Sequence, residues 1–314
     1  MARRRILYVH HGSGTGGAPL SLCSLIRELD RDHYEPILCC HPAETSAIDL
    51  FSRWGYEPLP WALTRCVHSA AGWWKPWSLR DVIAGTRWLR SFGPSCRALR
   101  RLLDAVQPDL VHLNSLTLLP YAPTARASGA KVVVHVREPA ARGLFGFRRA
   151  WLRRIAQRDV DAVVAICVDN RDRLTGAHPR TRVIYNFVDF GEFDRNLDRA
   201  AARRALGIAP DAPVVLFAGG SSAEIKGIVP MLHALVRLRD RGGPLTCLMP
   251  GTIAAAPRPA GRLRRLLRGK VGEQRVVETI AALRLDDVVR RFGFRSDMPA
   301  FYAASDVVAV PFIK

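Results

Sequence analysis

Short apolar segments recur along the first half of the chain, separated by longer stretches in which apolar and charged residues follow helical spacing. The apolar segments are rich in valine, isoleucine and leucine and do not alternate with polar residues, which is typical of parallel strands buried on both faces. Strands that alternate with helices indicate an α/β fold with a doubly wound parallel sheet. The expected strands of this series are RRILYVH, YEPILCC, PDLVHL, KVVVHV, DAVVAI and TRVIYN.

The same pattern restarts in the second half of the chain. The charged segment FDRNLDRAAARRALGI and a turn at 209–211 precede a second series of strands, APVVLFAGG, PLTCLMPG, DVVRRFGF and SDVVAVPF. We therefore expect two consecutive Rossmann-like domains, at residues 1–190 and 191–314. The second series has fewer strand–helix units than a complete domain of this architecture, so we expect the second domain to be partial.

Composition narrows the class of partner. The formal net charge of the 314 residues is +19, and arginine carries nearly all of it, because lysine is rare. This excess predicts an anionic partner, and charge alone leaves open a phospholipid surface, a lipid diphosphate, a nucleotide or a nucleic acid. No apolar run approaches the ~20 residues of a membrane span, and the basic N-terminus lacks a cleavage site, so we expect a cytoplasmic protein. The seven cysteines form no C-x-x-C pair and are expected to be reduced core thiols.

A glycine-rich loop follows the first expected strand, in ILYVHHGSGTGGAPLSL. Gly12, Gly14 and Gly17 match G-x-G-x-x-G, whose glycines let backbone amides approach a pyrophosphate. A dinucleotide site also needs an acid after the second strand, where a histidine and a proline stand. A Walker A loop is excluded because its lysine and serine or threonine are absent. The alternative is a plain turn with Pro19 at the first helical position.

Histidines follow several expected strands of the first domain. The carboxyl ends of parallel strands meet at one edge, where α/β proteins bind ligands, so we expect a polar crevice there. The spacings H-x-x-x-H and H-E-x-x-H do not occur, and no metal site is expected. The histidines at this edge are His10, His11, His41, His112 and His135.

The second domain opens with a comparable loop, FAGGSSAEIKGIVPMLHAL. Gly219 and Gly220 end a strand, and a helix begins near Lys226. Amides at a helix N-terminus beside a lysine make an anion site that suits a diphosphate. The alternative is an ordinary capped helix with an exposed lysine.

An aromatic and basic segment lies between Trp54 and Phe92. Indole rings together with arginines suit the headgroup zone of a bilayer, which would fit a peripheral membrane protein. The alternative is that these tryptophans pack beneath a long loop. Its tryptophans are Trp61, Trp73, Trp74, Trp77 and Trp88.

These segments, in their order and spacing, resemble glycosyltransferase family 4, which has the GT-B fold of two Rossmann-like domains facing across a cleft. The resemblance covers nearly the whole chain. The segments that carry it are HGSGTGGAPLSL, PDLVHLNS, KVVVHVRE, VIYNFVD, FAGGSSAEIKG and RRFGFRSDMPAFYAASDVVAVP.

The resemblance implies transfer of a sugar, with retention of configuration, from a nucleotide-diphosphate donor to an acceptor hydroxyl, which we expect on a lipid-linked or cell-envelope glycan. It implies no metal or other cofactor and no nucleic acid. By position, His135 would contact the transferred sugar, and Lys226 would neutralise the departing β-phosphate. Donor-binding residues would be Gly16, Gly17, Gly220, Ser221, Lys226, Phe294 and Arg295. Acceptor-side or cleft residues would be His11, His112, Asn114, Glu138 and Asn186.

Two departures from the family pattern keep a second hypothesis open. Ser221 stands where the family usually has an arginine, and the family's pair of glutamates would lie beyond Lys314. The chain is therefore either a fragment of a longer enzyme or a truncated, non-catalytic nucleotide-sugar-binding protein. Nucleic-acid binding has no recognition signature in its favour, and an epimerase would need proton-transfer carboxylates that have no place in the pattern.

Overall fold

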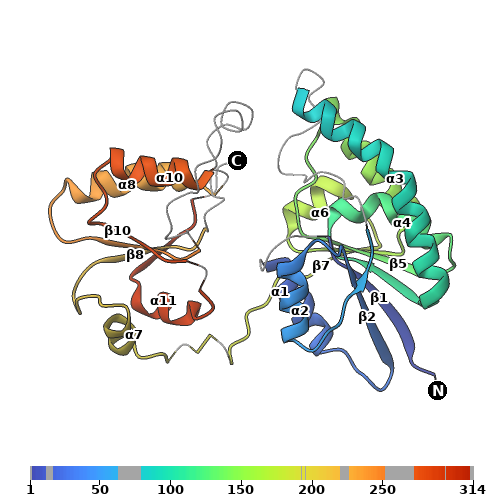
Figure 1. Cartoon of the computed structure of the whole chain (residues 1–314), viewed down its shortest axis with the longest axis horizontal. Helices are drawn as coiled ribbons and strands as arrows, with labels where there is room; N and C mark the ends of the chain where they lie inside the picture. Colours follow the sequence, from blue (N-terminus) through green and yellow to red (C-terminus); the bar gives the residue numbers. More distant parts are fainter. Residues whose placement is uncertain are drawn as a thin grey trace. The chain divides into compact units, whose positions relative to one another are not determined.

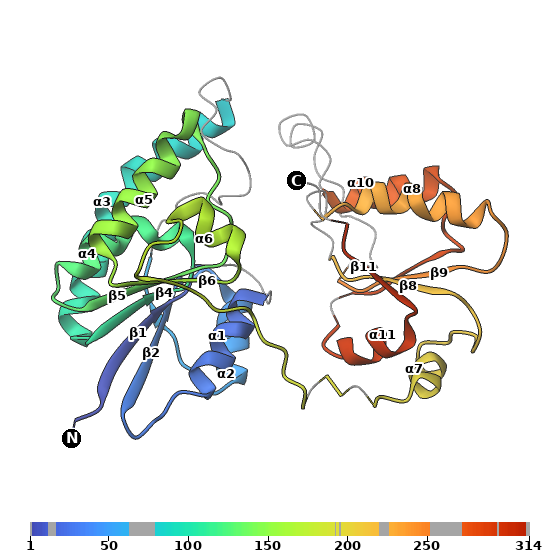
Figure 2. The same cartoon turned by 180° about the vertical axis from the view of Figure 1, so that it is seen from behind.

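The computed structural model describes residues 2–11, 17–62, 79–191, 193–194, 196–219, 226–251, 272–293 and 295–311. The chain divides into unit 1, which ends at Phe187, and unit 2, which begins at Val188 (Figures 1 and 2). Each unit has a parallel sheet covered by helices on both faces, which confirms the expected α/β class with two Rossmann-like units. The expected boundary was residue 190.

Unit 1 contains a seven-stranded sheet in the order β3-β2-β1-β4-β5-β6-β7, and its neighbouring strands pair in parallel. The strand order reverses between β1 and β4, which is the switch point where open α/β sheets bind ligands. Its elements are β1 (Arg4–Val9), α1 (Gly17–Arg27), β2 (Tyr34–Cys40), α2 (Thr45–Arg53), β3 (Leu59–Pro60), α3 (Leu79–Val106), β4 (Leu110–Leu113), η2 (Leu116–Tyr121), α4 (Ala122–Arg126), β5 (Lys131–Val136), η3 (Leu144–Gly146), α5 (Phe147–Asp159), β6 (Ala162–Ala165), α6 (Val168–Leu174) and β7 (Thr181–Val183).

Successive residues of β1 enter different cores, as alternation along a strand requires. Leu7 and Val9 belong to the larger cluster, which α3, η2 and α5 cover. Ile6 and Tyr8 belong to the smaller cluster, beneath α1 and α2. Burial on both faces explains why the strand sequences are continuously apolar.

Unit 2 contains a four-stranded parallel sheet in the order β10-β9-β8-β11. One face packs against α8 and α10, and the other packs against α7 and α11. Its switch point lies between β8 and β11. Its elements are α7 (Arg199–Ala205), β8 (Val214–Phe217), α8 (Ile228–Arg239), β9 (Thr246–Met249), α10 (Gly272–Ala282), β10 (Val289–Arg291), α11 (Met298–Ala304) and β11 (Val307–Ala309).

At three places in the sheets, an aspartate directly before one strand hydrogen-bonds to the backbone of the neighbouring strand. Before β11, the Asp306 carboxylate accepts the Val214 N–H at 2.7 Å, and the Asp306 N–H donates to the Val214 carbonyl at 2.9 Å. Asp109 makes the same two bonds with Arg5 of β1, and Asp161 makes them with Val132 of β5. We call these three residues the strand-start aspartates. Each one sets the pairing register at the amino end of its strand pair.

Several local expectations differ from the structure. Strand β7 ends at Val183, because Ile184, Tyr185 and Asn186 leave the sheet and are exposed. The last strand, β11, is not buried, because it forms the outer strand of the described sheet; Val307 is 56% exposed. Pro19 is the third residue of α1 rather than the first.

Candidate functional site

The carboxyl ends of β1, β4 and β5 bring four of the five expected histidines together. His112 and His135 lie on adjacent strands with ring centroids 5.6 Å apart, and His10 and His11 follow β1 with centroids 5.3 Å apart. All four side chains are buried. The fifth, His41, follows β2 and accepts a backbone N–H two residues along the chain, as in a turn.

Asn114 and Arg137 connect these histidines. The Asn114 side-chain oxygen accepts a hydrogen bond from Arg137 Nε at 2.8 Å, and its amide nitrogen lies 3.2 Å from His10 Nδ1. Arg137 Nη2 lies 3.4 Å from His135 Nδ1. Arg137 Nη1 also reaches Asn186 Oδ1 at 3.5 Å. Two expected cleft residues, Asn114 and Asn186, therefore meet at one guanidinium.

Glu138 anchors a neighbouring turn. Its carboxylate accepts the Ser115 hydroxyl at 2.9 Å and the Leu116 N–H at 3.1 Å, at the start of η2. His11 Nε2 lies 3.5 Å from the same carboxylate. Because a helix start leaves backbone N–H groups without intrahelical partners, this buried carboxylate has a clear structural role.

Burial and a nearby cation set the charge of this site. Burial first, and the Arg137 charge second, lower the pKa of His112 to about 3. Burial, Arg137 and His112 lower the pKa of His135 to about 3. Burial lowers the pKa of Arg137 to about 10, against the opposing charge of Glu138. At neutral pH the charged guanidinium of Arg137 therefore lies beside two uncharged imidazoles, those of His112 and His135.

In unit 2, two glycines frame the expected donor loop. A β-carbon on Gly219 would lie 2.3 Å from the Phe217 ring. Gly227 has φ +75°, and a β-carbon there would lie 1.7 Å from the carbonyl oxygen of Pro311. Lys226, half-buried, stands directly before Gly227, and α8 follows. The backbone around Lys226 is thus fixed by close packing that only glycine permits.

Arg295 is held by its neighbours. Its Nε donates to Asp297 Oδ1 at 2.8 Å, and its Nη2 donates to Asp297 Oδ2 at 2.5 Å. The guanidinium also lies 5.5 Å from the Phe301 ring centroid. If Arg295 bound the donor base, as the resemblance implies, that contact would compete with the bidentate hydrogen bonds to Asp297. Gly17, another expected donor residue, is described at the start of α1 with open space around its α-carbon.

Some sequence expectations fall on residues that the structure does not describe. They are Gly12, Gly14, Gly16, Gly220, Ser221, Phe294, Trp73, Trp74 and Trp77. Trp61 and Trp88 are described and are core residues: Trp61 packs edge-on against Tyr121 at 5.0 Å, and Trp88 packs against Trp151 at 6.0 Å. For these two, the membrane interpretation was wrong, because their side chains are buried, Trp61 against Tyr121 of η2 and Trp88 of α3 against Trp151 of α5.

Arg137 and Ser115 belong to the site, but the sequence interpretation assigned them no role. A signal was present, because Arg137 and Glu138 directly follow β5 and Ser115 follows the expected Asn114. A charged residue at the carboxyl end of a buried strand enters the edge where such sheets bind ligands.

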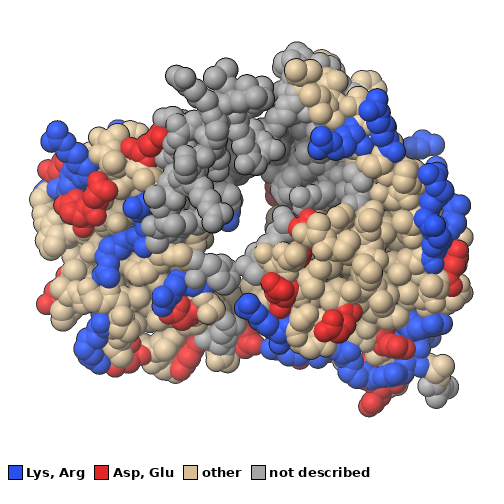
Figure 3. Space-filling model, in the orientation of Figure 1, with Lys and Arg blue, Asp and Glu red and all other residues tan. Residues whose placement is uncertain are grey.

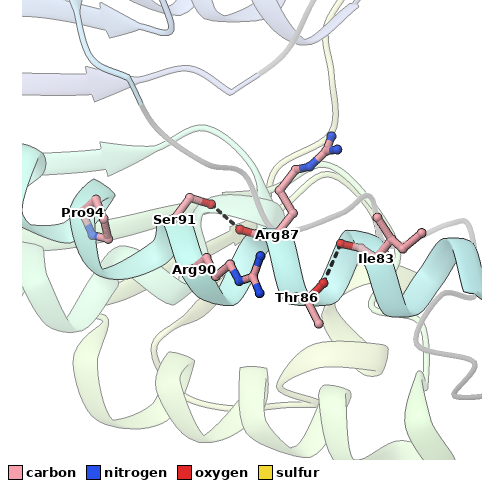
Figure 4. Close-up of a pocket in the computed structure, with 6 residues that line it drawn as sticks. All are labelled: Ile83, Thr86, Arg87, Arg90, Ser91 and Pro94. Carbon is pink, nitrogen blue, oxygen red and sulfur yellow. Dashed lines mark hydrogen bonds between the residues drawn. The ribbon is translucent and has the colours of Figure 1, made fainter.

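A pocket of about 490 Å³ lies along α3 (Figure 4). Its two hydroxyls donate back to the carbonyls of the same helix, Thr86 to Ile83 at 3.0 Å and Ser91 to Arg87 at 2.6 Å. None of the expected site residues lines this pocket.

Two further searches of the described residues bear on the class of protein. No described helix is long and apolar enough to cross a membrane. Within the same part of the chain, no three histidine, cysteine or acidic side chains gather as metal ligands would. The expectation that no metal or other cofactor takes part stays a prediction. The described cysteines are free thiols, and four of the six are buried.

Several solved structures share the fold of this chain at low sequence identity. Anabaena Alr3699/HepE, solved with UDP and glucose, superimposes with a TM-score of 0.70 at 19% identity, over 98% of this chain and 74% of that one. A glycosyltransferase from Rickettsia africae gives 0.65 at 16%, over 100% and 74%. Sucrose-phosphate synthase from Thermosynechococcus elongatus gives 0.64 at 15%, over 99% and 76%. These likenesses confirm the expected GT-B type of fold.

The search of curated proteins finds no match for this sequence. The sequence model of Glycosyltransferase Family 4 matches residues 15–192, which is more than half of the chain. That range runs from the glycine-rich loop through every strand of unit 1 after β1, and it includes Asn114, His135 and Arg137. The chain therefore belongs to Glycosyltransferase Family 4 and is an enzyme of the transferase class.

Proposed function

We propose that this enzyme transfers a sugar from a nucleotide-diphosphate donor to an acceptor hydroxyl, with retention of configuration at the anomeric carbon. Unit 1 would hold the acceptor side, and unit 2 would bind the donor nucleotide. HepE was solved with UDP-glucose, UDP, and UDP with glucose, which supports a nucleotide-sugar donor for this chain.

The observation that carries the proposal is the setting of Lys226. Negative charge collects on the diphosphate as its bond to the sugar breaks, and a cation held at that place stabilises the transition state more than the ground state. Lys226 stands on a backbone that Gly227 fixes, immediately before α8, whose N-terminal amides also favour an anion. His135 would contact the transferred sugar from unit 1.

The test compares Lys226→Ala and His135→Ala with Lys131→Ala. Lys131 is an exposed lysine whose ammonium lies 3.4 Å from Asp161, at the opposite edge of the unit 1 sheet. With UDP-glucose and a panel of acceptors, Lys226→Ala should lower kcat by about 10²–10³-fold, the usual loss for one charge-stabilising group. Lys131→Ala should leave kcat unchanged. Unchanged turnover in both Lys226→Ala and His135→Ala would reject these roles, and NMR of the product's anomeric proton tests retention.

A second candidate is a nucleotide-sugar-binding protein without turnover. The bidentate pair between Arg295 and Asp297 favours it, because that arginine is then not free for the donor. Calorimetry decides between the two: ordinary UDP-glucose affinity with no product from any acceptor, in this chain and in a C-terminally longer one, would support the binding protein.

We further propose that unit 1 docks on an anionic membrane from the cytoplasmic side, where a lipid-linked or cell-envelope acceptor would be presented. Phe145 in η3 and Phe147 at the start of α5 are 86% and 71% exposed. Burial first, and then the charges of Arg142 and Arg153, lower the pKa of Arg149, so these arginines lie near one another. Apolar rings beside arginines suit a headgroup layer.

Arginines also line α3 along the outer edge of unit 1 (Figure 3). Among the described side chains of α3, the exposed arginines are Arg87, Arg90, Arg97, Arg100 and Arg101.

Sedimentation with phosphatidylglycerol vesicles tests the docking of unit 1 on an anionic membrane. Replacing Phe145 and Phe147 by serine should weaken binding about tenfold or more, while Phe190→Ser, an exposed ring of unit 2, should not. Protein that stays in the supernatant at low salt would contradict the proposal.

A further inference from the structure

The side chains around Arg137 form a chain of hydrogen bonds whose direction is fixed by chemistry. A guanidinium carries only donors. Arg137 Nη2 lies 3.4 Å from His135 Nδ1, so that ring nitrogen must accept. A neutral imidazole has one N–H, so its proton is then on Nε2.

The second branch runs through Asn114. Arg137 Nε donates to Asn114 Oδ1 at 2.8 Å, which assigns the oxygen of that amide. The amide nitrogen therefore faces His10 Nδ1, at 3.2 Å, and the Ala18 carbonyl, at 3.4 Å. A carbonyl can only accept, so the Ala18 contact confirms this orientation independently. His10 Nδ1 must accept as well, and its proton is also on Nε2.

We infer that Arg137 is a positioning residue that locks His135 as a neutral Nε2–H tautomer, so that His135 acts as a hydrogen-bond donor to a substrate oxygen and not as a base. Asn114, which Arg137 and the Ala18 carbonyl orient together, selects the same tautomer for His10. The part that concerns the substrate rests on the proposed function; the tautomers do not. His135 Nε2 is buried and has no hydrogen-bond partner among the described residues, so its N–H is available for a ligand.

The neighbours of His135 support the neutral state. The groups that influence its charge are Arg137, beyond the end of its own strand, and His112 on β4. Across the ladder on β6 its partner is Val164, which is apolar. The one carboxylate close along the chain, Glu138, is bonded to Ser115 and Leu116. The pKa of His135, lowered to about 3, keeps the ring uncharged throughout the range in which a histidine usually titrates.

The first test is NMR on the whole chain with ¹⁵N-labelled histidine, which separates the two tautomers by their long-range couplings. His135 should show the Nε2–H form from pH 5 to 9 without titration, because its pKa is lowered to about 3, and neutral His10 should show the same tautomer. An Nδ1–H tautomer at His135 in the wild-type protein would overturn the inference, and this measurement needs neither a variant nor a substrate.

Two substitutions separate the branches. In Arg137→Met His135 should become a tautomer mixture and its pKa should rise, because a positive neighbour is gone, whereas His10 should stay mainly Nε2–H, because the Ala18 carbonyl still orients Asn114. In Asn114→Ala only His10 should change. A His135 tautomer that stays pure Nε2–H in a folded Arg137→Met protein would overturn the inference. If that variant does not fold, an Asn114→Ala protein with an unaltered His10 tautomer would overturn it in its place.

Turnover supplies the functional readout. The Nε2 of glutamine can replace the histidine Nε2–H as donor, whereas the shorter asparagine cannot reach that place. His135→Gln should therefore retain about tenfold more kcat than His135→Asn, the scale of one hydrogen bond in the transition state. Equal losses in both would overturn the donor role of His135. Absence of any transferase activity in the wild type would instead count against the proposed function and leave the NMR result standing.

Discussion

The two units place their candidate residues at equivalent positions, the carboxyl ends of strands beside a switch point, but they hold them by different means. In unit 1 the site is a network of side-chain hydrogen bonds. Arg137 donates to Asn114, Asn114 bonds to His10, and Glu138 accepts from Ser115. In unit 2 the frame is backbone, because Gly219 and Gly227 pack where no side chain fits. The first arrangement should be sensitive to the loss of a functional group, and the second to the gain of a methyl group.

The largest loss in the free energy of unfolding is expected from Gly227→Ala, in unit 2. The left-handed conformation costs about 1–2 kcal/mol with a β-carbon, and overpacking against Pro311 adds about 1–3 kcal/mol. Unit 2 should lose stability by the sum of these in urea unfolding. Gly242→Ala is the matched control, because Gly242 has φ +82° and open space around it, so only the conformational cost applies. Equal losses in the two variants would show that contact with Pro311 does not matter.

A smaller effect is expected in unit 1 from Glu138→Gln. One carboxylate oxygen becomes an amide nitrogen, so the Ser115 hydroxyl must turn from donor to acceptor, and both hydrogen bonds lose their charged acceptor. We expect a loss of about 1–3 kcal/mol in the free energy of unfolding, read from the unit 1 transition. Glu28→Gln, an exposed ion-pair partner of Arg27, should change it by less than about 0.5 kcal/mol. A Glu138→Gln protein as stable as the control would contradict the anchoring role.

The smallest effect is expected from Asp306→Asn. The Val214 N–H, followed by the hydrogen bond and charge of Arg199 and the charge of Arg203, holds the pKa of Asp306 below its ordinary value. The carboxylate therefore stabilises unit 2 fully above that ordinary value, about 4, and this contribution is lost as the pH falls through the lower folded value. At pH 7 the variant should be about 1 kcal/mol less stable.

The pH dependence is the sharper part of this prediction. The stability difference between wild type and Asp306→Asn should shrink in urea titrations as the pH is lowered from 5 to 2. Part of the cost is offset because the buried Arg203 keeps other partners, the carbonyls of Ala304 and Ala212 among them. A difference that stays constant over this range would mean that the Asp306 charge contributes nothing.

Much of the fold could be predicted from the sequence because its strands are buried on both faces. A continuous apolar run then marks each strand, and the residues at its carboxyl end mark the edge where ligands bind. On this basis the prediction that His10, His112 and His135 lie at one edge was correct. β3 could not be predicted in this way, because Leu59 and Pro60 alone form it. The exposure of β11 could not be predicted either, because a valine-rich sequence is the same whether the strand lies at the edge or in the middle of a sheet.

The connections within the site were less predictable than its location. Arg137 was visible as a charged residue after a strand, but its contacts depend on the distance to Asn114, which lies 23 residues earlier in the chain. The contacts of Glu138 were not predictable either, because the sequence shows a carboxylate near a histidine but not that Ser115 and Leu116 bond to it. Periodicity assigns residues to an edge of the sheet, but it does not determine which side chains pair there.

Strand pairing and the candidate site depend on residues at opposite edges of the same sheets, and the strand-start aspartates serve the pairing. Asp109, Asp161 and Asp306 set register at the amino edge, whereas histidines, arginine and lysine occupy the opposite edge. Substitutions that retune donor or acceptor preference can therefore accumulate at the carboxyl edge while strand pairing stays in place. A library that randomises the residues after β1, β4 and β5 and keeps these aspartates should yield folded variants far more often than one that randomises the other end.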